Sequence, residues 1–226
     1  MPRAAIKKGF NARFLLKTGL CYARNQQQTE AAELGMEAQR GVSAHAGRTS
    51  KNAEADNIID RFAGRAIFPW ISMSGKVVAF GGRKLDKETK GVQQKYVNSP
   101  DSDIYHKDHE LYGIYQAKRA IAKEDCVYMV EGYTDVISMH QCGIENVVAN
   151  SGTALSVHQI RMLHRLTKNI VLLYDGDAAG IKAAMRGTDM ILEEGMNIKV
   201  LLLPDNEDPD SFARKHTVEE FRKYID

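Results

Sequence analysis

Four apolar segments, separated by segments of helical spacing, constrain the fold of this chain more than any other feature. We expect strands at 126–130, 146–149, 170–174 and 198–203. The helices expected between them cover 134–141, 156–166 and 178–194. Short apolar strands that alternate with helices are typical of a parallel sheet whose two faces are both covered by helices. The sequence therefore predicts an α/β domain built on a four-stranded parallel sheet.

The preceding half of the chain predicts a lobe of mixed α and β structure. It contains a short helix before Gly19 and a helical pattern at 110–123, and its predicted strands are 66–71, 76–81 and 95–100. Residues 26–57 have few large apolar side chains, so they bury too little surface to offset the entropy of ordering, and we expect a flexible insertion. We therefore expect a basic α+β lobe at 1–123, the α/β domain at 124–212, and the start of a helical region at 213–226.

The charges are divided unevenly along the chain. Residues 1–125 hold 21 Lys and Arg against 14 Asp and Glu, whereas residues 126–212 hold 6 against 12. A basic half beside an acidic half favours a polyanion held by one part and metal ions held by the other. The alternative is two surfaces that differ only in their solvated charges.

Composition argues against several classes of protein. No apolar run approaches the roughly 18 residues of a membrane helix, and the first residues lack the apolar core of a secretory signal. The three cysteines form no CxxC pair, so we expect neither structural zinc nor a disulfide framework. We expect a cytoplasmic protein with no membrane contact.

Acidic side chains follow three of the four predicted strands. Glu131 comes directly after the first strand, Asp175 and Asp177 come directly after the third, and Asp208 and Asp210 follow the fourth. Because the carboxyl ends of parallel strands lie at one edge of a sheet, we expect these carboxylates at the same edge. An acidic residue there can also simply cap a helix N-terminus, which is the alternative for each one taken alone.

A cluster of carboxylates is the ligand set of a hard divalent cation. Mg²⁺ takes oxygen ligands, and two such ions about 3.5–4 Å apart stabilise the attacking and leaving oxygens of a phosphoryl transfer. Without cations these carboxylates would repel one another. The pattern predicts a metal-dependent phosphoryl-transfer site.

Three motifs in this half resemble the signatures of the TOPRIM fold. They are Glu131-Gly132-Tyr133-Thr134-Asp135, Asp175-Gly176-Asp177-Ala178-Ala179-Gly180 and Asp208-Pro209-Asp210. Segments before them, Phe80-Gly81-Gly82-Arg83, Lys95-Tyr96-Val97-Asn98-Ser99-Pro100 and His106-Lys107, are similar to the basic lobe of bacterial DnaG-type DNA primases. The complete set, in this order, resembles the primases more than other TOPRIM proteins.

This resemblance implies a function and a set of site residues. Glu131, Asp175 and Asp177 would hold catalytic Mg²⁺ or Mn²⁺, and Asp135, Asp208 and Asp210 would complete the acidic site. The residues that would line a groove for nucleic acid and nucleotides are Arg83, Lys95, Tyr96, Asn98 and Lys107. The chain would be a DNA-directed RNA polymerase that makes RNA primers on single-stranded DNA from ribonucleoside triphosphates at the replication fork, near the nucleoid.

Two features depart from the family pattern. The primases it resembles carry a zinc module and a domain that contacts the replicative helicase, and this sequence contains neither. We therefore expect a fragment of the polymerase core or an unusually short relative. Another TOPRIM enzyme, such as a nuclease or topoisomerase-related protein, and a non-catalytic single-strand-binding fragment are the alternatives.

Overall fold

The computed structural model describes residues 2–24, 57–85, 94–152, 154–174, 187–204 and 207–225. The chain packs as two compact units. Met1–Pro69 and Ala79–Tyr105 form the first, and Trp70–Val78 and His106–Asp226 form the second.

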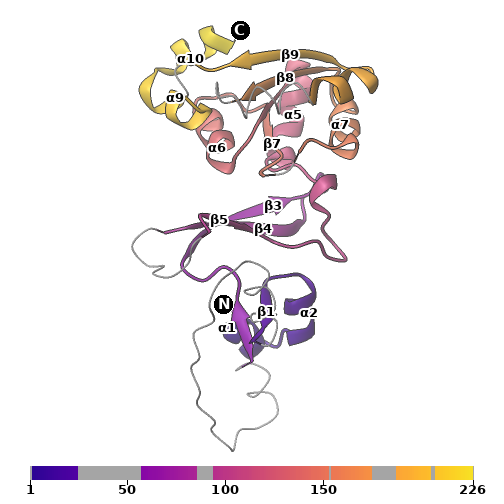
Figure 1. Ribbon diagram of the computed structural model, residues 1–226, viewed down its shortest axis with the longest axis vertical. Coiled ribbons are helices and arrows are strands. Elements are labelled where there is room, and N and C mark those ends of the chain that lie inside the picture. The colour runs from indigo at the N-terminus through magenta and orange to yellow at the C-terminus, as the bar shows by residue number, and fades with distance from the viewer. Residues whose placement is uncertain are drawn as a thin grey trace, which may run out of the picture. The chain divides into compact units, whose positions relative to one another are not determined.

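A four-stranded parallel sheet forms the centre of the second unit (Figure 1). Its strands, in spatial order, are β7 (Val147–Ala149), β6 (Val127–Val130), β8 (Asn169–Tyr174) and β9 (Asn197–Leu202). Each neighbouring pair is parallel. The predicted α/β fold with four parallel strands is therefore confirmed.

Alternate residues of these strands bury themselves in two separate cores, one on each face of the sheet. On β6, Met129 joins the core that contains Ile121 of α5 (Ile114–Glu124) and Leu163 of α7 (Val157–His164). The next residue, Val130, joins the opposite core. The helices of that opposite core are α6 (Tyr133–Gln141), α9 (Pro209–Lys215) and α10 (Val218–Ile225). The period of two along a strand produces this division, and it explains why the inner strands β6 and β8 are mostly apolar, whereas β9, at the edge of the sheet, carries Lys199 and is largely exposed.

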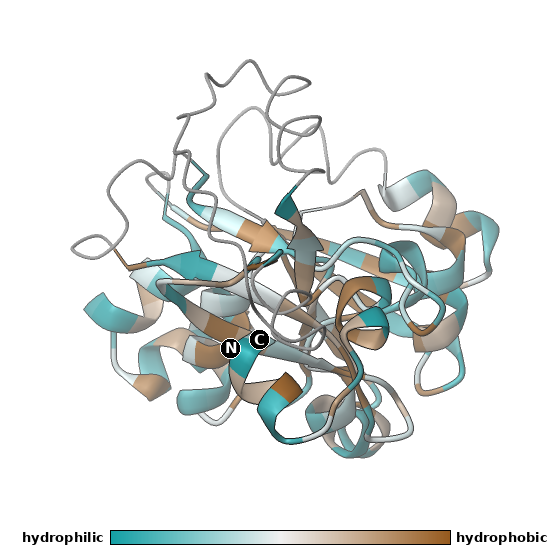
Figure 2. Cartoon of the chain, turned by 90° about the horizontal axis from the view of Figure 1, so that it is seen from below, coloured by the Kyte–Doolittle hydropathy of each residue, from teal (hydrophilic) through white to brown (hydrophobic). Residues whose placement is uncertain are grey.

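The helices are amphipathic, as expected for a layer between a sheet and water. Figure 2 shows hydrophobic and hydrophilic residues interleaved along them. Residues 187–193 are helical, in agreement with the predicted helix at 178–194, whose first part lies outside the described residues. Ile191 of this helix belongs to the same core as α5 and α7.

The first unit is built from short elements. They are α1 (Pro2–Lys7), α2 (Ala12–Lys17), β1 (Cys21–Ala23), β2 (Ile58–Asp60), β3 (Arg65–Ile71), β4 (Val77–Lys84) and β5 (Tyr96–Asn98). The last three form one sheet in the order β3-β4-β5, in agreement with the predicted strands, although the final residues of β3 and the first of β4 pack with the second unit. The antiparallel pair β1–β2 was not predicted, because each strand has only three residues and its partner is distant in sequence.

One close contact within this unit explains why position 19 is occupied by glycine. Gly19 has a φ of +66°, and a Cβ at this position would lie 2.3 Å from Cδ of Pro100. Both the backbone conformation and the proline ring therefore exclude a side chain here. The contact joins the end of α2 to the segment that follows β5.

The predicted insertion at 26–57 lies outside the described residues except for Asn57, whose carbonyl accepts a hydrogen bond from the backbone N–H of Arg24 at 2.9 Å. The predicted domain boundaries at 123 and 212 remain predictions. In the described residues no helix is both long and apolar enough to cross a membrane.

The packing of α5 leads to a first prediction. Ile121 is fully buried beneath the sheet, so Ile121→Ala should lower the free energy of unfolding by about 2–5 kcal/mol through lost burial and an unfilled cavity. Lys123→Ala is a matched control on the same helix, since the Lys123 side chain is 82% exposed, and it should change stability little. Urea denaturation monitored by circular dichroism measures both, and equal effects would contradict the assignment of α5 to the core.

Candidate functional site

The sheet changes its direction of winding between β6 and β8. From β6 the chain passes through α6, on one face, to β7, and returns through α7, on the other face, to β8. The helix α6, which follows β6, and the helix at 187–193, which follows β8, therefore cover opposite faces of the sheet, because Ile191 of the latter packs on the α7 side. In open parallel sheets such a divergence opens a crevice at the carboxyl edge, where ligands bind.

Glu131 lies at this point of divergence. It directly follows β6 and is exposed. The pairing of Met129 with Leu172 places Glu131 level with Tyr174, the last residue of β8. Asp175 and Asp177, the other predicted metal ligands, lie outside the described residues. The topology therefore brings Glu131 to the predicted edge and leaves the positions of its two proposed partners as predictions.

An aromatic cluster supports the backbone beside Glu131. Tyr133 is buried at the first position of α6, and its hydroxyl accepts a hydrogen bond from Nε1 of Trp70 at 3.1 Å. The ring centroid of Tyr133 lies 4.7 Å from that of Tyr112, and both rings meet Trp70 edge to face. Three interlocked rings fix the loop that carries Glu131 more firmly than a solvated turn would.

The remaining predicted acids all have structural partners. Asp135 is buried, and its Oδ2 accepts a hydrogen bond from the backbone N–H of Gly132 at 2.8 Å, which closes the first turn of α6. Asp208 caps α9 by accepting from the backbone N–H of Ser211 at 2.6 Å. These two carboxylates perform the helix-capping role that is the alternative to metal binding.

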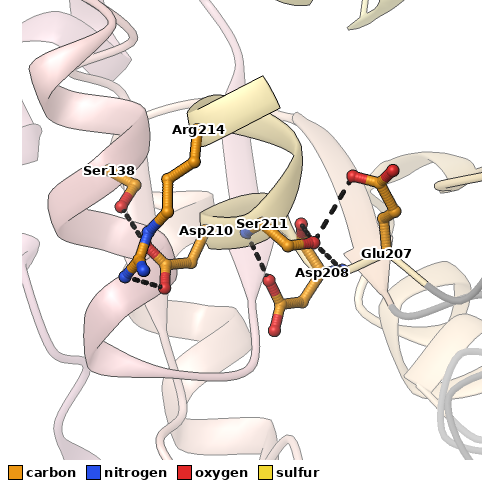
Figure 3. Close-up of polar contacts among 6 residues, drawn as sticks. All are labelled: Ser138, Glu207, Asp208, Asp210, Ser211 and Arg214. Carbon is orange, nitrogen blue, oxygen red and sulfur yellow. Dashed lines mark hydrogen bonds and ion pairs between the residues drawn. The ribbon is translucent and has the colours of Figure 1, made fainter. Parts of the chain in front are cut away.

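Asp210 connects two helices (Figure 3). Its Oδ1 accepts from Oγ of Ser138 on α6 at 2.5 Å, and Arg214, one turn later on α9, donates to both carboxylate oxygens at 3.2 and 2.6 Å. The Asp210 side chain is only 17% exposed. A cavity of about 360 Å³ borders this contact between α6 and α9. Asp210 therefore anchors α9 to α6.

The described acids do not by themselves form a metal site. Among the residues that the structure describes, no three His, Cys, Asp or Glu side chains are grouped closely enough to hold a metal ion. The donor chemistry nevertheless fits a hard cation, since Glu131 presents carboxylate oxygens at the edge where β8 leads into Asp175. A metal site here depends on the residues that follow β8.

Three of the five predicted nucleic-acid contacts lie on β4 and β5 of the first unit, and a fourth, Lys95, directly precedes β5. Arg83 pairs with Tyr96 and Gly81 pairs with Asn98, so the side chains of Arg83, Tyr96 and Asn98 share one face of the sheet. The Arg83 guanidinium lies 5.8 Å from the Tyr96 ring centroid, and Lys95 Nζ lies 5.9 Å from it. Tyr96 is 36% exposed. Two cations beside an accessible ring match the requirements of single-strand binding.

The backbone of this face is held by Arg65 of β3. Its guanidinium donates to the carbonyl oxygens of Gly82, Gln94 and Lys95 at 3.1–3.3 Å. Burial lowers the pKa of Arg65 from its usual value. Arg65 thus joins the two strands that carry the predicted contacts.

Lys107, the fifth predicted contact, belongs to the second unit. It begins the short helix η1 (Lys107–His109), and its Nζ donates to the carbonyl of Gly152 at 3.4 Å. Gln159 of α7 donates to the carbonyl oxygens of Lys107 and Glu110. The turn that carries Lys107 is therefore fixed to the first turn of α7.

Sequence reasoning missed the residues that support the site. Arg214 could have been found, because it lies four residues after Asp210, where helical side chains meet. Ser138 and Arg65 left no comparable signal, since each contacts a segment far away in the sequence.

Comparisons with known proteins agree with this geometry. Residues 5–118 match the family described as "DNA primase catalytic core, N-terminal domain", and residues 128–213 match the family described as "Toprim-like". A DNA primase of Halalkalibacterium halodurans is 44% identical over 166 residues, which are 74% of this chain and 27% of that protein. The chain thus spans about a third or less of the length of such relatives.

Solved structures agree in fold and sequence. The RNA polymerase domain of Mycobacterium tuberculosis primase DnaG is 30% identical, with a TM-score of 0.78, over 99% of this chain and 64% of that one. A DnaG primase catalytic domain described as bound to ssDNA is also 30% identical, with a TM-score of 0.69, over 99% of this chain and 69% of that one. The predicted family and fold are confirmed.

The Asp210 anchor predicts an order of effects on stability. Ser138→Ala should lower the free energy of unfolding by about 1.5–3 kcal/mol, because it removes a partly buried hydrogen bond to a carboxylate. Arg214→Ala should cost only about 0.5 kcal/mol, because the arginine is 70% exposed. A double-mutant cycle of Ser138→Ala with Asp210→Ala, measured by urea denaturation without metal, should give a coupling energy above about 0.5 kcal/mol. Additive effects would show that the two side chains do not interact.

Glu110 predicts a pH dependence of stability. Burial raises the pKa of its carboxyl, and His109 acts in the opposite direction. The ionised form is thus less favourable in the folded state than in the unfolded state. Stability contributed at this position should fall as pH rises from the ordinary glutamate pKa of about 4.3 through the raised value. Glu110→Gln should therefore gain stability over the unchanged protein across this window and keep the gain at higher pH. Denaturation curves at several pH values measure the difference, and a difference independent of pH would contradict the raised pKa.

Proposed function

The chain belongs to the bacterial DnaG-type DNA primase family, and on this premise we propose that it forms the catalytic core that synthesises RNA primers on single-stranded DNA. The observation that carries the proposal is the position of Glu131 at the carboxyl end of β6, level with Tyr174, the last described residue before the Asp175-Gly176-Asp177 motif in the sequence. The product would serve DNA replication in the cytoplasm, at the fork. The replicative helicase is the expected partner of the full-length relatives.

The proposed reaction is a nucleotidyl transfer. The 3′-hydroxyl oxygen of the growing primer attacks the α-phosphorus of an incoming ribonucleoside triphosphate. The bond between that phosphorus and the bridging oxygen breaks, pyrophosphate leaves, and the hydroxyl proton passes to solvent. Such a transfer requires the three reacting groups to lie in line, so catalysis depends largely on positioning and electrostatics.

The acidic edge would hold the cation that this chemistry requires. Glu131, Asp175 and Asp177 would hold Mg²⁺ or Mn²⁺, which when bound stabilises the negative charge on the reacting oxygens. Asp135, Asp208 and Asp210 would complete the acidic site. Their hydrogen bonds to Gly132, Ser211 and Ser138 set the first turns of α6 and α9, and so fix the backbone around the edge.

The basic face of the first unit would guide the template. Arg83 and Lys95 would neutralise phosphates, while the exposed Tyr96 ring would stack on a base. Asn98, on the same face, would donate to a phosphate or a base edge, and Lys107 would contact phosphate from the second unit. Together these side chains supply the phosphate, stacking and hydrogen-bonding contacts that a single-stranded nucleic acid requires.

One assay separates this proposal from its rivals. The chain is incubated with single-stranded template, labelled ribonucleotides and Mg²⁺ or Mn²⁺. Labelled extension products support primer synthesis. A shortened template would identify a TOPRIM nuclease, and a template that is bound but unreacted would identify a non-catalytic binding fragment.

Matched acid variants test the site itself. Glu131→Gln and Asp175→Asn should each reduce primer synthesis at least about a hundredfold, because each removes a proposed metal ligand, and losing even one neutral group that stabilises transition-state charge typically costs about 10²–10³ in rate. Glu145→Gln is the control: this exposed glutamate precedes β7, at the amino edge of the sheet, and its loss should leave synthesis unchanged. Full activity of Glu131→Gln would remove the acidic edge from the mechanism.

A further inference from the structure

Three imidazoles gather beside Lys107 in the second unit. The ring centroids of His109 and His158 lie 3.9 Å apart, and those of His106 and His109 lie 5.5 Å apart. All three histidines are exposed. His106 directly precedes η1, His109 is its last residue, and His158 lies in the first turn of α7. We call these three side chains, together with Lys107, the imidazole patch.

The backbone beneath the patch is held by several hydrogen bonds. Ser156 Oγ donates to the carbonyl of Asp108 at 2.5 Å, and Gln159 Nε2 donates to the carbonyls of Lys107 and Glu110 at 3.2 and 2.8 Å. Gln159 is fully buried. The turn and the helix therefore present the rings as one preorganised surface, which reduces the entropy lost on binding a ligand.

The patch lies at the same edge of the sheet as Glu131. The helix α7 follows β7, so its first turn begins at the carboxyl edge, and β7 is the hydrogen-bonded neighbour of β6. Glu131 directly follows β6. The imidazoles and Glu131 therefore belong to the same edge of the sheet, which a single strand at the acidic edge could also reach.

The charges around the patch make it responsive to pH. Imidazole is the side chain whose ordinary pKa, about 6.5, lies closest to neutral pH, and two imidazolium ions held in contact repel each other. The charged groups beside the rings are the Asp108 carboxylate, 3.8 Å from His109, and Glu110, whose carboxyl interacts with His109 and whose pKa burial raises, while Lys107 adjoins His106 in the sequence. A phosphate placed against the rings would relieve the repulsion between two imidazolium ions, so binding it would draw protons onto them.

We propose that the imidazole patch is a phosphate-binding site for single-stranded nucleic acid, and that it strengthens binding as the pH falls. The proposal rests on the proposed function for the class of ligand. The location of the site is inferred from the positions of the three imidazole rings alone. A metal site is a poorer account, because no metal-binding group of three is found among the described residues. At low pH each protonated imidazole of the patch can donate to phosphate alongside the Lys107 ammonium.

The test measures binding of a labelled oligothymidylate by fluorescence anisotropy, in EDTA, across a series of salt concentrations. For the unchanged chain the log–log salt slope should steepen between about pH 8 and about pH 6, by about 0.7 for each imidazolium that contacts a phosphate. In His109→Gln combined with His158→Gln, the slope near pH 6 should equal the slope near pH 8. His158→Gln alone should show a smaller change in salt slope between about pH 8 and about pH 6 than the unchanged chain. This single variant replaces the double variant in the test if the double variant is unstable.

The control is His140→Gln, which removes an exposed histidine from α6. It should keep the full pH dependence of the unchanged chain. An unchanged chain whose slope does not vary with pH would overturn the proposal, as would a double variant that keeps the full variation.

These outcomes are separate from those of the proposed function, because EDTA prevents metal-dependent synthesis. Binding that depends on pH through His109 and His158, without primer synthesis in the activity assay, supports the patch and contradicts the enzyme. Primer synthesis with binding that is independent of these histidines supports the enzyme and contradicts the patch.

Discussion

The divergence of the chain at the carboxyl ends of β6 and β8 is the constraint on which the rest of the second unit depends. The helices that follow these two strands pack on opposite faces of the sheet, and in open parallel sheets such an arrangement favours a ligand-binding crevice at the carboxyl edge. The two buried cores on either side of the sheet fix the two helical layers. The position of Glu131 at this edge is therefore set by the packing of the two buried cores, not by contacts at the edge itself.

Several acids near the edge have a structural task in addition to any chemical one. Asp135 closes the first turn of α6, Asp208 caps α9, and Asp210 links the two helices. A carboxylate with a fixed donor is held in one orientation, and a fixed orientation is what an electrostatic site requires. Stability and chemistry are therefore difficult to separate at these positions from activity alone. Glu131 is exposed at the end of its strand, where a bound cation could reach it.

Sequence reasoning recovered the sheet because the signals for it are local. The runs that became β6 and β8 are apolar throughout, and the glycines and polar residues between the elements mark their ends. The pairing of β1 with β2 and the contacts of Arg65 with Gln94 and Lys95 join segments far apart, and no periodicity encodes them. The acids were found because they follow strands. The imidazole patch was not, because its rings come from two elements that only the folded chain brings together.

The β1–β2 pair has a consequence for how sequences of this kind can vary. Its register, from Cys21 with Asp60 to Ala23 with Ile58, together with the hydrogen bond between Arg24 and Asn57, brings the two ends of the intervening segment side by side. Once those ends are joined, the entropy of closing the chain between them grows only as the logarithm of its length, by about 0.6 kcal/mol for each doubling. Changes in the length or sequence of that segment should therefore affect the stability of the β1–β2 pair only slightly.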